Sequence, residues 1–185
     1  MQHLREEGQP VHVMDIAAGH GRYVLDALTA QELPDSIRLR DYSSLNVEAG
    51  RKLIHERQLQ DIARFDEVNA YERANYQNPD PQPTLGIVSG LHELFPDNDL
   101  INQSLLGFAD AIASGNYLIY TNQPWHPQLE MIARCLTSHR QGEAWVMRRR
   151  SQREMDQLVA AAGFDKVRQL IDEDGIFTVT LARKR

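Results

Sequence analysis

The sequence predicts an α/β protein built on a Rossmann-like, doubly wound and mostly parallel seven-stranded sheet with a C-terminal antiparallel hairpin. Strand patterns alternate with helical patterns from end to end, which favours a layered α/β fold. A glycine turn joins the first strand to the first helix, and residues 172–175 fit a hairpin turn between the last two strands. A length of 185 residues suits a single domain, 1–185.

The first half of the chain alternates strand and helix. In the second strand, Ile37, Leu39 and Asp41 alternate as expected for a strand with one buried face. Ser43 and Ser44 are both suitable N-caps for the helix that follows. The expected strands are 11–14, 36–43 and 63–68, and the expected helices are 23–28 and 45–54.

The second half continues this alternation after a loop at 75–83 that contains three prolines. Ser151 caps a helix, with Glu154 placed for a capping box, and Gly163 ends it. The expected elements are strands at 84–89, 116–121, 166–171 and 176–181, and helices at 99–113 and 151–162.

The glycine turn after the first strand is the main candidate site. Gly19 and Gly21 allow a sharp turn and a close approach of a ligand to the backbone, and Asp15 adds a carboxylate. An isolated Gly-x-Gly turn is equally consistent with a simple strand-to-helix connection. However, Asp41 follows about 20 residues later at the end of a strand, where an acidic residue typically binds both ribose hydroxyls.

The order Asp-x-Ala-x-Gly-x-Gly-Arg at 15–22, then Asp-Tyr-Ser at 41–43 before a helix, resembles the class I S-adenosylmethionine-dependent methyltransferases. The resemblance covers nearly the whole chain and is closest to uncharacterised bacterial methyltransferases, some of which follow an α/β-hydrolase domain. It implies S-adenosylmethionine as cofactor. The implied cofactor-binding residues are Asp15, Ala17, Gly19, Gly21, Asp41, Tyr42, Asn69, Ala70, Ser89 and Leu91.

The resemblance also assigns parts of the cofactor. It places the methionine part at Asp15 and the glycine turn, the ribose at Asp41 and the adenine beside Tyr42. The family often has Asp-Ala after the third strand, whereas this chain has Asn69-Ala70. The Asn69 amide oxygen can still accept from the adenine amino group, and Asp66 is the competing candidate.

The ends of the fourth and fifth strands are the expected acceptor side. The segment Leu-His-Glu-Leu-Phe-Pro-Asp at 91–97 is similar to one in small-molecule O-methyltransferases, which makes His92 a candidate general base. The alternative is a pocket-wall histidine bonded to backbone. Phe95, Trp125 and His126 are candidates for contact with a small-molecule or lipid-like acceptor, although Trp125 equally fits a buried loop anchor.

Composition excludes several classes of function. A net charge of −6 argues against an extended nucleic-acid interface, and the basic run at 148–150 is expected to be a solvated edge. No apolar run is long enough to span a membrane. The single cysteine, Cys135, gives no metal signature and is expected to be a buried core thiol in a cytoplasmic protein.

Two other functions are also consistent with the sequence. One is a non-catalytic module that binds a cofactor or regulates an attached or partner hydrolase domain. The other is a nucleotide-dependent oxidoreductase, which the missing third glycine disfavours. Because the first strand begins near Val11, the helices that usually precede it are short or missing, and we expect the chain to be one domain of a longer protein.

Overall fold

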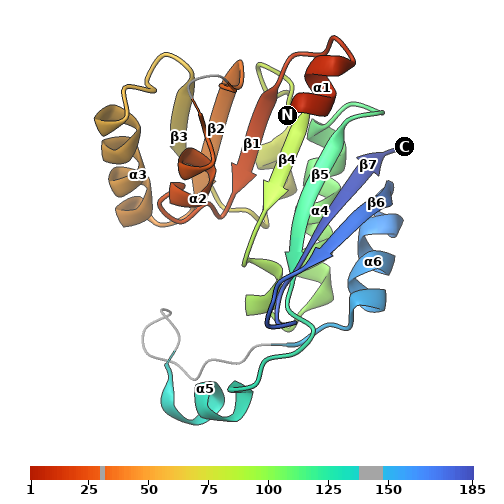
Figure 1. Cartoon of the computed structure of the whole chain (residues 1–185). Helices are drawn as coiled ribbons and strands as arrows, with labels where there is room; N and C mark the ends of the chain where they lie inside the picture. Colours follow the sequence, from red (N-terminus) through yellow and green to blue (C-terminus); the bar gives the residue numbers. More distant parts are fainter. Residues whose placement is uncertain (30–31, 138–147) are drawn as a thin grey trace.

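The computed structural model describes residues 1–29, 32–137 and 148–185 (Figure 1). The strands are β1 His12–Ile16, β2 Ser36–Asp41, β3 Ala63–Glu67, β4 Leu85–Val88, β5 Tyr117–Asn122, β6 Phe164–Ile171 and β7 Thr178–Lys184. The helices are α1 Gln2–Glu6, α2 Arg22–Asp26, α3 Ser44–Glu56, α4 Asn98–Ala111, α5 Leu129–Cys135 and α6 Gln152–Ala161. Two short 3-10 helices are η1 Arg73–Tyr76 and η2 His92–Leu94.

The strands form one seven-stranded sheet in the order β3-β2-β1-β4-β5-β7-β6. Neighbouring strands from β3 to β5 are parallel, whereas β7 runs antiparallel to both β5 and β6. This arrangement confirms the predicted fold class, including the C-terminal hairpin. The order reverses between β1 and β4, and ligands of open α/β sheets bind at such a switch point.

Helices cover both faces of the sheet (Figure 1). On one face, α4 and α6 bury a core that includes Phe108, Met155 and Phe164. On the other face, α2 and α3 pack over the strands from β1 to β3, around Leu39 and Phe65, and His3 of α1 contacts Tyr117 of β5. Both chain termini lie at the end of the sheet where β1 begins and β7 ends (Figure 1).

The predicted helix caps are present. The Ser43 hydroxyl accepts from the Asn46 backbone N–H at 3.5 Å and starts α3. The Ser151 hydroxyl accepts from the Glu154 backbone N–H at 3.2 Å and starts α6. These caps satisfy N–H groups that the first helical turn leaves without an intrahelical partner.

The helix around Cys135 differs from the prediction. The spacing of Leu129, Ile132 and Leu136 predicts an amphipathic core helix, but α5 has no buried residue and Cys135 is exposed. Figure 1 shows α5 standing away from the sheet. The expectation of a buried core thiol is therefore wrong. The apolar spacing gives the helix an apolar face, but it does not guarantee that another element packs against that face.

Candidate functional site

A cavity of about 970 Å³ opens at the carboxyl ends of β1, β2, β3 and β4. It contains eight of the residues expected to bind cofactor or substrate: Ala17, Gly19, Asp41, Tyr42, Asn69, Ala70, Leu91 and Phe95. The remaining lining residues are Ser43, Leu45, Asn46, Glu67, Val68, Tyr71, Gly90, Leu94 and Leu100. The structure thus brings together side chains that are far apart in the sequence.

The turn after β1 has a left-handed backbone at three alternate residues. Ala17, Gly19 and Gly21 have φ values of 54°, 58° and 69°. A Cβ atom on Gly19 would meet no protein atom within 4 Å, because it would point into open space at the cavity. A Cβ on Gly21 would lie 2.4 Å from Leu39 Cδ1, so this glycine lets the turn pack closely on β2. The two glycines therefore serve different purposes.

The Asp41 carboxylate connects two segments that line the cavity. Its Oδ2 accepts from the Gly19 N–H at 2.9 Å, and its Oδ1 accepts from the Ser43 N–H and the Asn46 side-chain amide, both at 3.0 Å. A carboxylate has about four lone-pair positions, so these three bonds leave room for another donor. Asp41 therefore joins the glycine turn to the start of α3 while lining the cavity.

Asp15 is fully buried beside the glycine turn. The Tyr23 hydroxyl donates to its Oδ1 at 2.6 Å, and its Oδ2 has no hydrogen-bond partner among the described atoms. Burial raises the pKa of Asp15 to about 8, although the bond from Tyr23 acts in the opposite direction. A buried polar atom usually has a partner, and the described chain supplies none for Oδ2; Asp15 itself does not line the cavity.

Asn69 and Ala70 line the cavity next to Tyr71, at the position expected for adenine. The Asn69 Oδ1 accepts from the Tyr71 N–H at 3.0 Å, and its Nδ2 donates to Glu72 at 3.0 Å. The side-chain oxygen therefore shapes this turn and keeps one lone pair. Asp66, the competing candidate, does not line the cavity and forms a 3.6 Å ion pair with Arg38.

A short network between β4 and β5 holds part of the rim of the cavity. The Gly90 N–H donates to the Thr121 hydroxyl at 2.9 Å, and this hydroxyl donates to Glu93 Oε1 at 2.9 Å. Gly90 lines the cavity at a φ of 69°, and a Cβ there would also meet nothing within 4 Å. Gly90 was not among the predicted site residues, although its place two residues after a buried strand could have indicated it.

His92 lies outside the cavity. It is 2% exposed, its Nε2 lies 3.3 Å from the Ser104 hydroxyl, and burial lowers its pKa to about 3. Arg150, which is also buried, donates to the His92 carbonyl at 2.8 Å and to Asn98 at 2.7 Å. The imidazole has no surface toward an acceptor, because it points into the core. A general base needs such contact, so this geometry does not support that role.

Several expectations for the outer part of the site differ from the structure. Ser89 is half-buried, Trp125 is 56% exposed and His126 accepts from the Gln128 N–H, and none of the three lines the cavity. The basic run at 148–150 is not a wholly solvated edge, because Arg150 clamps η2 to α4. The signal for Arg150 was absent from the sequence, since its partners lie more than fifty residues away.

The described residues show neither a cluster suited to a metal ion nor a helix able to cross a membrane. In the described part of the chain, no group of three or more His, Cys, Asp or Glu side chains is arranged so that it could hold a metal ion. Within the same residues, no helix is both long and apolar enough to span a bilayer.

The strand order, the glycine turn and the acidic residue at the end of β2 define a Rossmann-like domain of the methyltransferase type. Residues 1–184 match the family described as "Putative methyltransferase", and the chain belongs to this family. It is 56% identical over 182 residues to "Uncharacterized protein YnbC" of Escherichia coli (strain K12). The match covers 98% of this chain and 31% of that protein, so the chain spans about a third of its relative.

Solved structures of methyltransferases share the fold. An O-methyltransferase family protein from Burkholderia thailandensis has a TM-score of 0.75 at 16% identity, over 96% of this chain and 52% of that one. An S-adenosylmethionine-dependent methyltransferase from Methanosarcina mazei has a TM-score of 0.71 at 17% identity, over 95% and 92%. Magnesium protoporphyrin IX methyltransferase from Synechocystis, solved with bound S-adenosylhomocysteine, has a TM-score of 0.72 at 14% identity, over 100% and 80%.

Proposed function

We propose that the chain binds S-adenosylmethionine in this cavity and transfers its methyl group to a small-molecule or lipid-like acceptor. The observation that carries the proposal is the pair Gly19 and Gly90. Both line the cavity with a left-handed backbone, and at both a side chain would occupy open space. Glycine at two such positions keeps room for a ligand that lies directly against the backbone.

The residues around the cavity fit the parts of this cofactor. Asp41 would accept from a ribose hydroxyl, and Asn69 and Ala70 would contact the adenine edge. The glycine turn would hold the methionine part, because Ala17 and Gly19 line the cavity there. When bound, S-adenosylmethionine supplies an electrophilic methyl group on its sulfonium. The chain itself then has to orient the acceptor and exclude water.

The cavity wall supports an apolar acceptor. Leu91, Leu94, Phe95 and Leu100 all line the cavity, and Phe95 packs edge-on against Tyr71 at 4.7 Å between ring centroids. Such walls bind apolar or aromatic groups through burial of surface. We assign no proton transfer to His92, because it lies in the core behind this wall.

We also propose a compartment and a partner for the protein. A single cysteine forms no internal disulfide, which favours a reducing cytoplasm. The relative from Escherichia coli is about three times as long as this chain, so it has room for another domain. We propose an attached or partner hydrolase domain for this chain, on the family resemblance described above.

Calorimetry with S-adenosylhomocysteine tests the proposed cofactor. We expect wild-type protein to bind it, and Asp41→Asn to weaken binding by about tenfold or more, because one hydroxyl loses a charged acceptor. Glu48→Gln on the exposed side of α3 is the matched control and should bind as wild type does. Absence of binding at millimolar ligand overturns the proposal, and binding of NADH instead would favour an oxidoreductase. Wild-type affinity in Asp41→Asn would reject the ribose contact alone.

A further inference from the structure

One face of the C-terminal hairpin carries no helix among the described residues (Figure 1). On β7, Thr178, Thr180 and Ala182 are buried, and Thr178 bonds to Gln152 of α6. Since side chains alternate along a strand, Val179 and Leu181 point to the opposite face. We call this surface the hairpin face and define it by Leu170, Phe177, Val179 and Leu181.

The hairpin face is apolar and accessible. Leu170 is 55% exposed, Val179 is 42% exposed and Phe177 is 39% exposed. Leu170 pairs directly with Val179 across the two strands, so their side chains share this face. Half-buried Ile119 of β5 pairs with Leu181 and extends the surface to a third strand. Large contiguous apolar patches on soluble proteins often mark a contact surface.

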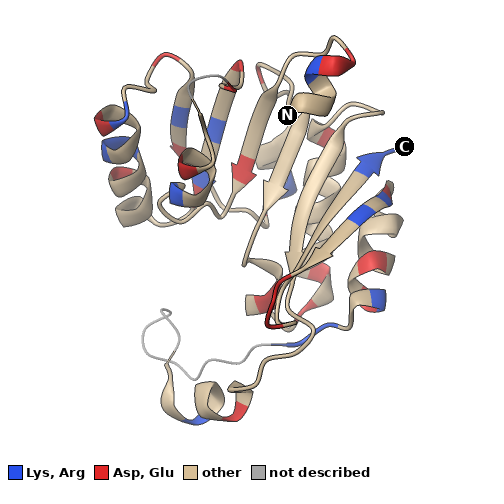
Figure 2. Ribbon diagram, in the orientation of Figure 1, with Lys and Arg blue, Asp and Glu red and all other residues tan. Residues whose placement is uncertain are grey.

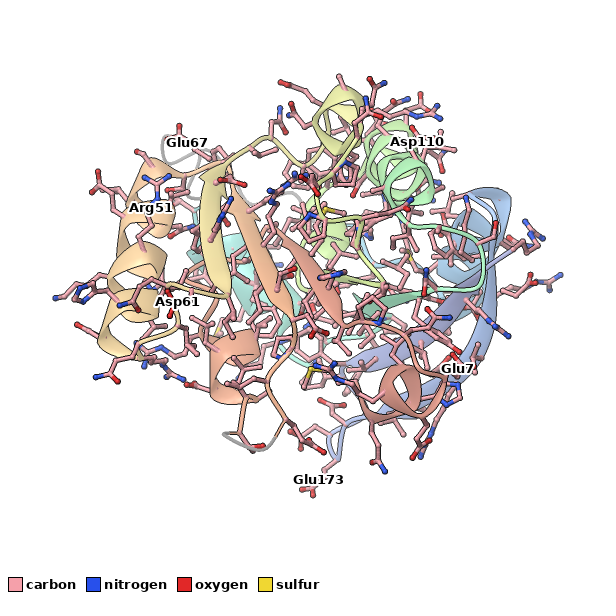
Figure 3. All side chains as sticks on the ribbon, turned by 90° about the horizontal axis from the view of Figure 1, so that it is seen from above. Glu7, Arg51, Asp61, Glu67, Asp110 and Glu173 are labelled. Carbon is pink, nitrogen blue, oxygen red and sulfur yellow. The ribbon has the colours of Figure 1, made fainter. Side chains whose placement is uncertain are left out.

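The two ends of the hairpin face carry opposite charges (Figure 2). The turn between β6 and β7 contains Asp172, Glu173 and Asp174. Seen from above, Glu173 projects on the side of the sheet away from α4, which is the side of the hairpin face (Figure 3). At the other end, Arg168 pairs with Leu181 and Arg183 follows it by two residues, so both point to this face as well. Asp165 lies there too and is paired with Arg185 at 3.5 Å.

We propose that the hairpin face is the contact surface of a two-fold symmetric dimer of this chain. A two-fold axis across the face reverses one hairpin relative to the other. The acidic turn of each copy then lies against Arg168 and Arg183 of its partner, and the apolar residues meet between them. A self-complementary surface of this kind is what an isologous contact requires, with an apolar centre and a polar rim.

The contact uses the face of the sheet rather than its edge. Strand β6 is an edge strand, but it carries Asp165, Lys166 and Arg168. Its pairing with β7 also changes register between Lys166 and Arg168. Charges and irregular pairing protect an edge from adding another strand. Two such sheets can instead pack face to face, about 10 Å apart.

Sedimentation over a concentration series tests the dimer, and adjacent residues provide a matched pair. Leu170 lies on the hairpin face, whereas Ile171, which is 63% exposed, pairs with Thr178 and points to the helix side. We expect wild type to dimerise and Leu170→Asp to raise the dimer Kd by at least about tenfold, because the new carboxylate would be buried without a partner. Ile171→Asp should leave the Kd unchanged.

Charge reversal gives a second test that does not place a charge in the apolar centre. Glu173→Lys with Asp174→Lys should weaken the dimer, and so should Arg168→Glu with Arg183→Glu. Combining all four should restore it, because each turn would again face opposite charge. Circular dichroism confirms that each variant is folded. A wild type that stays monomeric at every concentration overturns the proposal, as does an equal effect of Leu170→Asp and Ile171→Asp.

Discussion

At the scale of single residues, two buried titratable side chains flank the site and respond to pH in opposite directions. The pKa of Asp15 rises from 3.8 to about 8, and that of His92 falls from 6.5 to about 3, in both cases chiefly because burial disfavours the charged form. Between pH 6.5 and 8 Asp15 makes the larger contribution of the two, because the unfolded His92 loses its proton near pH 6.5 and then matches the neutral folded form. In the folded state Asp15 keeps a proton that the unfolded chain has released.

We therefore expect the free energy of unfolding to decrease between pH 6.5 and 8. The unfolded state binds fewer protons in this range, so the decrease is at most about 1.4 kcal/mol per pH unit from this one group. Asp15→Asn should remove that decrease, and Asp174→Asn in the exposed hairpin turn should keep it. Urea unfolding at the two pH values measures the difference. A decrease of equal size in Asp15→Asn would show that another group is responsible.

The candidate site illustrates what the sequence could and could not predict about residues. The glycine turn and Asp41 could be predicted, because the chain fixes them at the ends of adjacent strands. The clamp made by Arg150 could not, because its partners come from a distant segment. His92 was predicted to face the acceptor but lies in the core. The sequence could not reveal this, because a loop residue after a strand has no periodicity that indicates burial.

At the scale of elements, the packing of α3 connects the fold to the site. A Cβ on Gly50 would lie 2.1 Å from Phe65 Cε1 on β3 and 3.2 Å from the His20 carbonyl oxygen in the glycine turn. Glycine at this position therefore lets the helix approach both the sheet and the turn. Nearer the start of α3, the Asn46 side-chain amide donates to Asp41, which also accepts from Gly19 of the glycine turn.

Gly50→Ala should destabilise the fold, in contrast to the usual effect of this change within a helix. Alanine favours a helix by about 1 kcal/mol over glycine, but overpacking here should cost about 1–3 kcal/mol. Urea denaturation measures the net change, with Glu48→Ala on the exposed side of α3 as control. Adding Phe65→Leu should recover part of the loss, since it removes the ring that the new methyl group meets. A more stable Gly50→Ala protein would contradict this account.

Elements with local signals were predicted well. The caps at Ser43 and Ser151 were visible in the sequence, because each depends on residues within one helical turn. The exposure of α5 could not be predicted, because its apolar spacing is typical of a helix but does not specify what the helix packs against. Burial depends on a partner elsewhere in the chain, and no pattern in a short window contains that information.

At the scale of the whole molecule, the fold class followed from the alternation of strands and helices and from the final hairpin. Right-handed crossovers and a switch in strand order then place the ends of β1, β2 and β4 beside one another. What the alternation could not predict is that no helix of the described residues covers the hairpin face (Figure 1), because strand residues with one buried side look alike whether the other side meets solvent or another protein.

The position of the chain ends has a practical consequence for how this domain can be joined to others. Both termini lie at the end of the sheet where β1 begins, and the cavity lies at the opposite ends of the strands (Figure 1). A folded protein fused before Met1 should therefore leave the affinity for S-adenosylhomocysteine within about twofold of that of the unfused chain, since it adds no contact at the cavity. Calorimetry of the fusion checks this, and a large loss of affinity would contradict it. Another polypeptide can therefore be joined at the chain ends without covering the cavity.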